Sequence, residues 1–296
     1  MVCIYHSRDL DGWMSAAIVK LKYPDVKLLG WDYGDEYYHI PEGEPVIMVD
    51  VSYPMDVMLT TAKISKWNLT WIDHHISAIK AYREFIGQGE SFMLATLDDE
   101  FAACELTWQR LFPNEPMPEL VRLLGRYDCF GHKGTNEERK VLEFQYGARG
   151  YIYNPETALI NLRMSATSKE YDDVTCKKIL KEGQAIYGYL CTEAKNSYKR
   201  IFPVVFDTYR FACINQDRFN PINFGIDYHK DGYDGFACFW YANGKWTFSL
   251  YNDNGNVDCS EICKRRGGGG HKGAAGFTTD VFDSVIVTLN DNSTDK

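Results

Sequence analysis

The sequence predicts an α/β protein, with an N-terminal, mainly parallel sheet flanked by helices and a smaller C-terminal α/β domain. Three observations support this fold class. The 296 residues exceed the length of one typical domain. The first half alternates short apolar runs with helical patterns, as βαβ units do. From residue 201 onward, aromatic and β-branched residues become more frequent.

The elements of the first half follow from hydrophobic periodicity. Four apolar runs predict strands, over residues 2–5, 26–29, 46–49 and 69–72. Helical spacing predicts helices over residues 13–21, 55–64, 100–112 and 119–127. Short apolar runs that alternate with helices favour parallel strands joined by crossovers.

A change of pattern indicates where the first domain ends. The polar stretch over residues 165–175 is followed by a helix-like run from residue 176 to about residue 199. We therefore expect a catalytic domain over 1–170, a helical linker over 171–199 and a substrate-binding domain over 200–296. In the last of these, two apolar runs flank Ala242, Asn243 and Gly244, which predicts a β-hairpin.

Composition and charge restrict the class of function. A net charge of −9 argues against a protein that coats long nucleic acid, duplexes included, because such binding depends on neutralising phosphates. No run reaches the roughly 18 apolar residues of a membrane span. Nine cysteines without a CxxC pair are typical of reduced thiols, so we expect a cytoplasmic protein with no membrane partner.

The first predicted strand leads directly into a turn rich in metal-ligand side chains. His6, Asp9 and Asp11 lie in the segment HSRDLDG, which ends at Gly12. An imidazole and two carboxylates on one strand-to-helix turn are typical of a metal site, and open α/β sheets bind ligands at the carboxyl ends of their strands. Taken alone, a solvated turn with a capping Asp explains this segment equally well.

Further potential ligands follow the third and fourth predicted strands. The third strand ends in Asp50 and the fourth in Asp73, His74 and His75. Asp50 alone fits a helix cap equally well, but the Asp-His-His triplet favours metal. Carboxylates and imidazoles without cysteine suit Mn²⁺ best, with Mg²⁺, Co²⁺ or Fe²⁺ as alternatives. Asp128, at a predicted helix end, is compatible with the shell of a second ion.

A positive island lies near the C-terminal end of the chain. Residues 262–279 contain no acid and four cations, namely Lys264, Arg265, Arg266 and Lys272. Within the island, a glycine run allows the backbone to approach a phosphate closely, and the following histidine adds a donor; these residues include Gly268, Gly269, Gly270 and His271. A flexible loop is the alternative. Aromatic residues such as Trp246, Tyr251 and Phe277 either stack on a base or, as we favour, belong to the core.

Together these motifs resemble the DHH phosphoesterase superfamily with its associated C-terminal domain. The resemblance rests on HxxDxDG, a strand-end Asp, Asp-His-His, a later Asp and GGGGHKGAAGF, and it covers essentially the whole chain. It implies that His6, Asp9 and Asp50 hold one ion. The other ion would be held by Asp11, Asp50, His74 and Asp128, with Asp50 as the bridge.

The resemblance also implies a function. We expect a Mn-dependent phosphoesterase in which a metal-bridging hydroxide attacks a phosphoester of a nucleotide or short oligonucleotide. His75 would contact the scissile phosphate or assist the leaving group. Arg265, Arg266 and the glycine run would bind the far end of the substrate across an interdomain cleft. The HxxDLDG form most resembles the nano-RNase (oligoribonuclease) and cyclic-nucleotide phosphodiesterase branch.

Other functions remain as alternatives. Within the superfamily these are a bisphosphate nucleotidase and an exopolyphosphatase or pyrophosphatase. From another class comes an inactive relative that binds single-stranded nucleic acid, although the retained acids and histidines speak against it. Two residues separate His6 from Asp9 where other branches have one or three, and the strand before the glycine run carries Tyr251 where many relatives have arginine. A homodimer is compatible with the sequence.

Overall fold

The structure is a computed structural model and describes residues 1–87, 89, 91–217 and 219–282. The chain divides into two compact units, Met1–Tyr187 and Gly188–Lys296, called here the N-terminal and C-terminal units. The division falls inside one long helix. The more detailed division at residues 170 and 199 stays a prediction, and residues 283–296 of the expected second domain lie outside the described residues.

The N-terminal unit is built on a five-stranded sheet in the order β2-β1-β3-β4-β5. Every strand pair in it is parallel, so the expected parallel sheet is confirmed. The strands are β1 (Val2–His6), β2 (Lys27–Trp31), β3 (Val46–Val49), β4 (Leu69–Asp73) and β5 (Leu94–Leu97). The chain leaves β1 toward β2 on one side and returns to β3 on the other, which makes the β1/β3 boundary the switch point where open sheets bind ligands.

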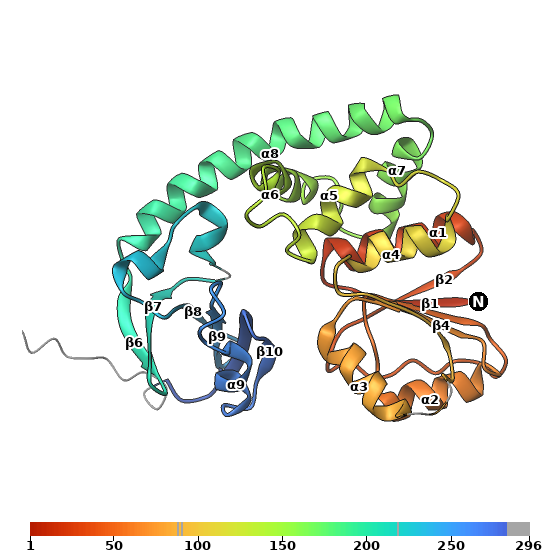
Figure 1. Cartoon of the computed structure of the whole chain (residues 1–296), viewed down its shortest axis with the longest axis horizontal. Coiled ribbons are helices and arrows are strands. Elements are labelled where there is room, and N and C mark those ends of the chain that lie inside the picture. Colours follow the sequence, from red (N-terminus) through yellow and green to blue (C-terminus); the bar gives the residue numbers. More distant parts are fainter. Residues whose placement is uncertain (88, 90, 218, 283–296) are drawn as a thin grey trace, which may run out of the picture. The chain divides into compact units, whose positions relative to one another are not determined.

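Helices cover both faces of this sheet. Figure 1 shows α1 (Leu10–Lys22) and α4 (Ala103–Leu111) on one face, and α2 (Met55–Ile64) and α3 (Ile76–Ile86) on the other. Alternate residues of a strand pack into two separate cores, because successive side chains point to opposite faces of the sheet. Cys3 joins one core with helices α1 and α4, whereas its neighbour Ile4 joins the core beneath α2.

Four more helices complete the N-terminal unit and its connection. They are α5 (Glu119–Asp128), α6 (Glu138–Ala148), α7 (Pro155–Ser165) and α8 (Lys169–Tyr198), and α8 continues into the C-terminal unit. The expected start of this last helix at residue 176 is wrong. Its polar first turns belong to the helix because they contact α5. The carboxylate of Asp172 points inward and accepts the backbone N–H groups of Glu119 and Leu120 at the start of α5.

The C-terminal unit contains a six-stranded mixed sheet in the order β10-β11-β9-β8-β7-β6. Its elements are β6 (Phe202–Phe206), β7 (Tyr209–Asn215), the 3₁₀ turns Pro221–Phe224 and Tyr228–Asp231, β8 (Gly235–Ala242), β9 (Lys245–Tyr251), α9 (Cys259–Lys264), β10 (Gly269–His271) and β11 (Ala274–Thr279). The predicted hairpin is confirmed as β8 and β9. Asn243 and Gly244 both have positive φ, at 53° and 80°, as a tight hairpin turn requires.

Two further findings concern the chain as a whole. All nine cysteines are free thiols, and most of them are buried. Among the described residues, no helix is both long enough and apolar enough to cross a membrane.

Candidate metal centre

The turn after β1 carries three of the predicted ligands. Asp9 is the N-cap of α1, since its Oδ1 accepts the backbone N–H of Gly12 at 2.9 Å. Its other oxygen lies 2.7 Å from His6 Nδ1. The turn is tight enough to require glycine, because a Cβ on Gly12 would lie 2.0 Å from the carbonyl oxygen of His6. The capping and ligand interpretations of Asp9 are therefore compatible with each other.

Asp11 faces inward from the first turn of α1 and is 2% exposed. Its two oxygens accept the backbone N–H groups of Ala103 and Cys104 at 2.9 and 2.7 Å. These N–H groups open α4, whose positive end favours a carboxylate. The second helix therefore fixes the direction of the Asp11 carboxylate.

Asp50 lies at the end of β3 in the left-handed region, with φ of 60°. It is 1% exposed. Within the described part of the chain, neither of its carboxylate oxygens has a hydrogen-bond partner. It does not cap α2, whose N-cap is Pro54 without a side-chain bond. A buried carboxylate is costly unless its charge is compensated, so this position is suited to a cation.

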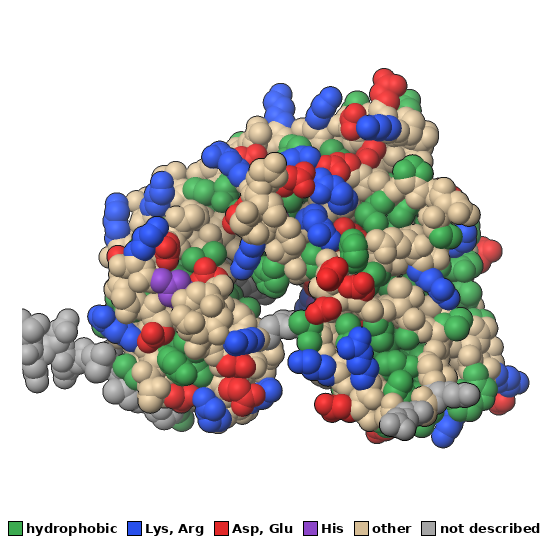
Figure 2. Space-filling model, in the orientation of Figure 1, with side chains coloured by type: hydrophobic (Ala, Val, Ile, Leu, Met, Phe, Trp, Pro, Cys, Tyr) green, Lys and Arg blue, Asp and Glu red, His purple; other side chains and the backbone are tan. Residues whose placement is uncertain are grey.

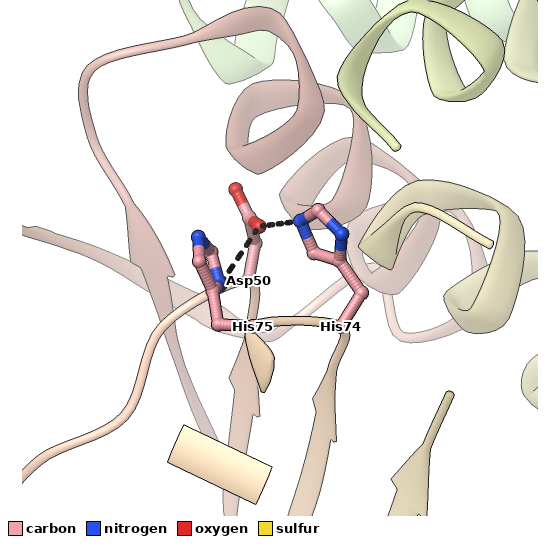
Figure 3. A group of neighbouring side chains, drawn as sticks. All are labelled: Asp50, His74 and His75. Carbon is pink, nitrogen blue, oxygen red and sulfur yellow. Dashed lines mark ion pairs between the residues drawn. The ribbon is translucent and has the colours of Figure 1, made fainter. Parts of the chain in front are cut away.

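The histidines that follow β4 lie on either side of Asp50, as Figure 3 shows. His74 Nε2 lies 3.4 Å from Asp50 Oδ1 and 3.1 Å from Asp128 Oδ2. His75 is more distant, with Nδ1 3.9 Å from Asp50 Oδ1. Residues that follow β3 and β4, with Asp128 from the end of α5, therefore converge at the carboxyl edge of the sheet.

Three overlapping groups have side-chain donors close enough to surround an ion. They are His6 with Asp9 and Asp50, Asp11 with His74 and Asp128, and Asp50 with His74 and His75, each with its donor atoms within 4.8 Å of one another. All six predicted ligands lie in these groups. Asp50 and His74 each belong to two of the groups, so neighbouring groups share donors, and Asp50 is grouped with His75 and not with Asp11 and Asp128.

The charges of this cluster perturb its histidines strongly. Burial lowers the pKa of His6, but the carboxylates of Asp50 and Asp9 outweigh it and raise the pKa to about 11. In His74, Asp128 and Asp50 likewise outweigh burial and raise the pKa to about 12. Burial, with Asp50 and Asp128, raises the pKa of the Asp11 carboxyl well above its usual range. The site thus concentrates negative charge that protons or metal ions must neutralise.

Two contacts were not predicted from the sequence. Asp73 is fully buried, and its Oδ1 accepts both following backbone N–H groups and lies 2.7 Å from Nδ1 of His75. It therefore orients that imidazole. Asp32, after β2, places Oδ1 3.5 Å from Nε2 of His6. The position of Asp32 directly after β2, beside β1, is the feature of the sequence from which this contact could have been predicted.

The predicted phosphate-binding arginines are engaged within the C-terminal unit. Arg265 and Arg266 both donate to Asp207, at 2.5 and 2.9 Å. Arg266 also donates to the carbonyl of Ile262 and lies over the rings of Phe206 and Phe277. On the face drawn in Figure 2, basic and acidic side chains of this unit lie side by side. The positive island is therefore partly neutralised by an acid from a distant part of the chain.

The glycine run makes a tight turn into β10. A Cβ on Gly268 would lie 2.1 Å from the carbonyl oxygen of Gly276, and Gly270 has φ of 136°. A Cβ on Gly269 would meet no atom within 4 Å, and this residue does not adopt positive φ, so the fold alone does not require glycine there. The backbone of His271 lies in β10, and its side chain is outside the described residues.

The aromatic residues considered for base stacking are mostly packed. Phe277 is 3% exposed within the core of the C-terminal unit, where Trp246 also packs. Tyr251 packs against a second cluster.

Comparison with known proteins identifies the fold. None of the protein-family models matches this sequence. The chain is 22% identical over 307 residues to an uncharacterized protein of Acanthamoeba polyphaga mimivirus, across 93% of this chain. It spans 66% of the length of that relative, slightly under two thirds.

Among solved structures, the DHH domain of a member of the s1p family of ribosomal proteins superposes with a TM-score of 0.54 and 14% identity, across 93% of this chain and 81% of that one. A pGpG-specific phosphodiesterase from Vibrio cholerae gives a TM-score of 0.48 and 13% identity, across 96% of this chain and 94% of that one. The chain has the fold of a DHH-domain protein, which confirms the resemblance to that superfamily at the level of the fold.

Proposed function

We propose that this protein is a divalent-metal-dependent phosphoesterase that hydrolyses nucleotides or very short oligonucleotides. The observation that carries the proposal is Asp50, a buried carboxylate without a hydrogen-bond partner among the described residues, between two imidazole-bearing groups. It lies at the switch point of the sheet, where such folds bind ligands.

The residues present fit two divalent ions. One set is His6, Asp9 and Asp50, and the other is Asp11, Asp50, His74 and Asp128. Oxygen and imidazole donors without cysteine suit Mn²⁺ better than they suit a thiolate zinc site. When bound, such a pair of ions lowers the pKa of water and neutralises charge that develops on a phosphoryl group.

The remaining residues of the site bind and orient the substrate. His75 is set by Asp73 and would face the scissile phosphate or the leaving oxygen. In the C-terminal unit, Arg265 and Arg266 are tied to Asp207. The backbone N–H groups of Gly267 and Gly268 already donate to the carbonyls of Lys264 and Cys263, so phosphate binding would fall to the free edge of β10 that follows them.

Two observations favour small nucleotides over other phosphate esters. The net charge of −9 disfavours long nucleic acid. The arginine pairing with Asp207 leaves less free positive charge for a polyphosphate or pyrophosphate chain. A bisphosphate nucleotidase, and an inactive binder of single-stranded nucleic acid, stay as alternatives.

A metal-dependent activity screen tests the proposal. The purified chain with Mn²⁺ is assayed against di- to pentanucleotides, cyclic mono- and dinucleotides, 3′,5′-bisphosphonucleosides and polyphosphate. Hydrolysis of the short nucleotides, abolished by chelation and by Asp50→Ala, is the expected result. Turnover of polyphosphate alone would support an exopolyphosphatase instead. Binding without any turnover would support an inactive relative.

A further inference from the structure

A hollow of about 800 Å³ in the N-terminal unit is not used by the metal-site residues. It is lined by four aromatic rings, Trp31, Tyr33, Tyr37 and Tyr53, with parts of the connections that follow β2 and β3 and of helix α3. Its size lies within the range of small-molecule sites.

The rings form a supported platform. Trp31 and Tyr53 are 3% and 2% exposed, and their ring centroids lie 4.9 Å apart. Tyr33 and Tyr37 pack on this buried pair at 5.4 and 6.1 Å from Trp31, yet they are 57% and 50% exposed. Two large rings are thus held in place by the core and left open to a ligand, at little conformational cost on binding.

The hollow adjoins the metal-site residues. Its lining residues Ser52 and Ser77 follow Asp50 and His75 by two positions each. The Tyr33 ring lies 6.4 Å from the ring of His6. A phosphoester at the metal site would therefore have its attached nucleoside beside these rings.

The charged residues that line the hollow indicate which part of a nucleotide binds there. Of the described residues that line it, the charged ones are Asp35 and Glu36, both acidic. Carboxylates repel a phosphate and accept hydrogen bonds from amino groups. Aromatic faces stack on bases. We infer that this hollow binds the nucleobase of the substrate, with an amino-bearing edge toward the two acids; the inference rests on the proposed function.

Binding of two matched ligands tests this site. Adenosine 5′-monophosphate and ribose 5-phosphate differ only in the base, and their affinities are measured by calorimetry with Mn²⁺ present. The wild type is expected to prefer the nucleotide. Tyr33→Leu should weaken nucleotide binding by about 5- to 150-fold, the range of one base stack, while leaving ribose 5-phosphate unaffected. Tyr33→Phe keeps the ring and should lie much closer to the wild type.

Tyr153→Leu is the matched control, since Tyr153 is 60% exposed in the same unit and does not line the hollow. It should bind both ligands as the wild type does. Equal wild-type affinity for the two ligands, or an unchanged preference in Tyr33→Leu, would overturn the base site. Hydrolysis of a diadenylate by the wild type is measured in parallel. Absence of hydrolysis of this substrate and of every other short nucleotide in the panel would refute the proposed function, whereas hydrolysis with equal affinities would refute the base site alone.

Discussion

At the scale of single residues, Asp50 has two features that lower the free energy of unfolding and that the fold alone does not require. Its left-handed backbone costs about 1–2 kcal/mol in a residue other than glycine. Its buried carboxylate has no hydrogen-bond partner among the described residues. Within the part of the chain that the structure describes, only the neighbouring imidazoles, at 3.4 to 3.9 Å, compensate its charge. Backbone strain at such a residue is typical of functional positions.

Replacing this carboxylate should therefore be more harmful than replacing a peripheral ligand. Asp50→Ala is expected to abolish turnover, because the bridging residue serves both ions, whereas His6→Ala affects one ion and keeps measurable activity. We expect their kcat values with saturating Mn²⁺ to differ by at least about 10-fold. Equal residual activities would contradict the bridging role.

Binding of metal should release protons. The pKa values of His6 and His74 are raised to about 11 and 12, so both imidazoles are charged at neutral pH before metal binds. A metal ion needs the neutral imidazole, so binding at pH 7 should release about two protons, and affinity should fall as pH falls. Calorimetry in buffers of different ionisation enthalpy counts the protons. Binding without proton release would mean that these histidines are not ligands.

At the scale of elements, α6 and α8 cross with glycine at the contact. A Cβ on Gly183 would lie 1.8 Å from the carbonyl oxygen of Glu143, whereas one on Gly188, five residues further along α8, meets no atom within 4 Å. Gly183→Ala should lower the free energy of unfolding by about 1–3 kcal/mol. Gly188→Ala should raise it by about 0.5–1 kcal/mol, since alanine favours the helix. Urea denaturation followed by circular dichroism measures both, and similar effects would contradict this packing.

The glycine run offers a second matched pair. Gly268→Ala should disturb β10 because the added Cβ meets the backbone of Gly276, while Gly269→Ala should leave stability near that of the wild type. Gly269→Ala then reports on phosphate access alone, through its effect on KM for a nucleotide. Equal loss of stability in both variants, again by urea denaturation, would show that the turn is different from the one described.

Which elements the sequence predicts depends on how their side chains are buried. Strands β1, β3 and β4 are continuous apolar runs, and their limits agree with the prediction to within one residue. Strand β5 was not predicted, although it lies in the mainly apolar run over residues 92–97, and its own residues are exposed or half-buried. Most candidate ligands were predictable because they lie at or just after the end of a strand, whereas Asp128 ends helix α5 and was assigned through the family resemblance. The pairing of Arg265 with Asp207 was not predictable from the sequence, because those residues are 58 positions apart and meet only in the folded unit.

At the scale of the molecule, the strand order explains why ligands from distant segments form one site. Parallel pairing of β1, β3 and β4 brings three carboxyl ends to one edge, where His6, Asp50 and His74 lie. Helix α4 fixes Asp11 from above one face, and the end of α5 supplies Asp128. The fold therefore assembles the site without a dedicated loop.

Anomalous diffraction from crystals soaked in Mn²⁺ tests whether Asp50 bridges two ions. We expect two manganese peaks about 3.5–4 Å apart, both coordinated by Asp50, with His6 and Asp9 on one ion and Asp11, His74 and Asp128 on the other. A single peak, or two peaks of which neither is bound by Asp50, would contradict the bridging role of Asp50.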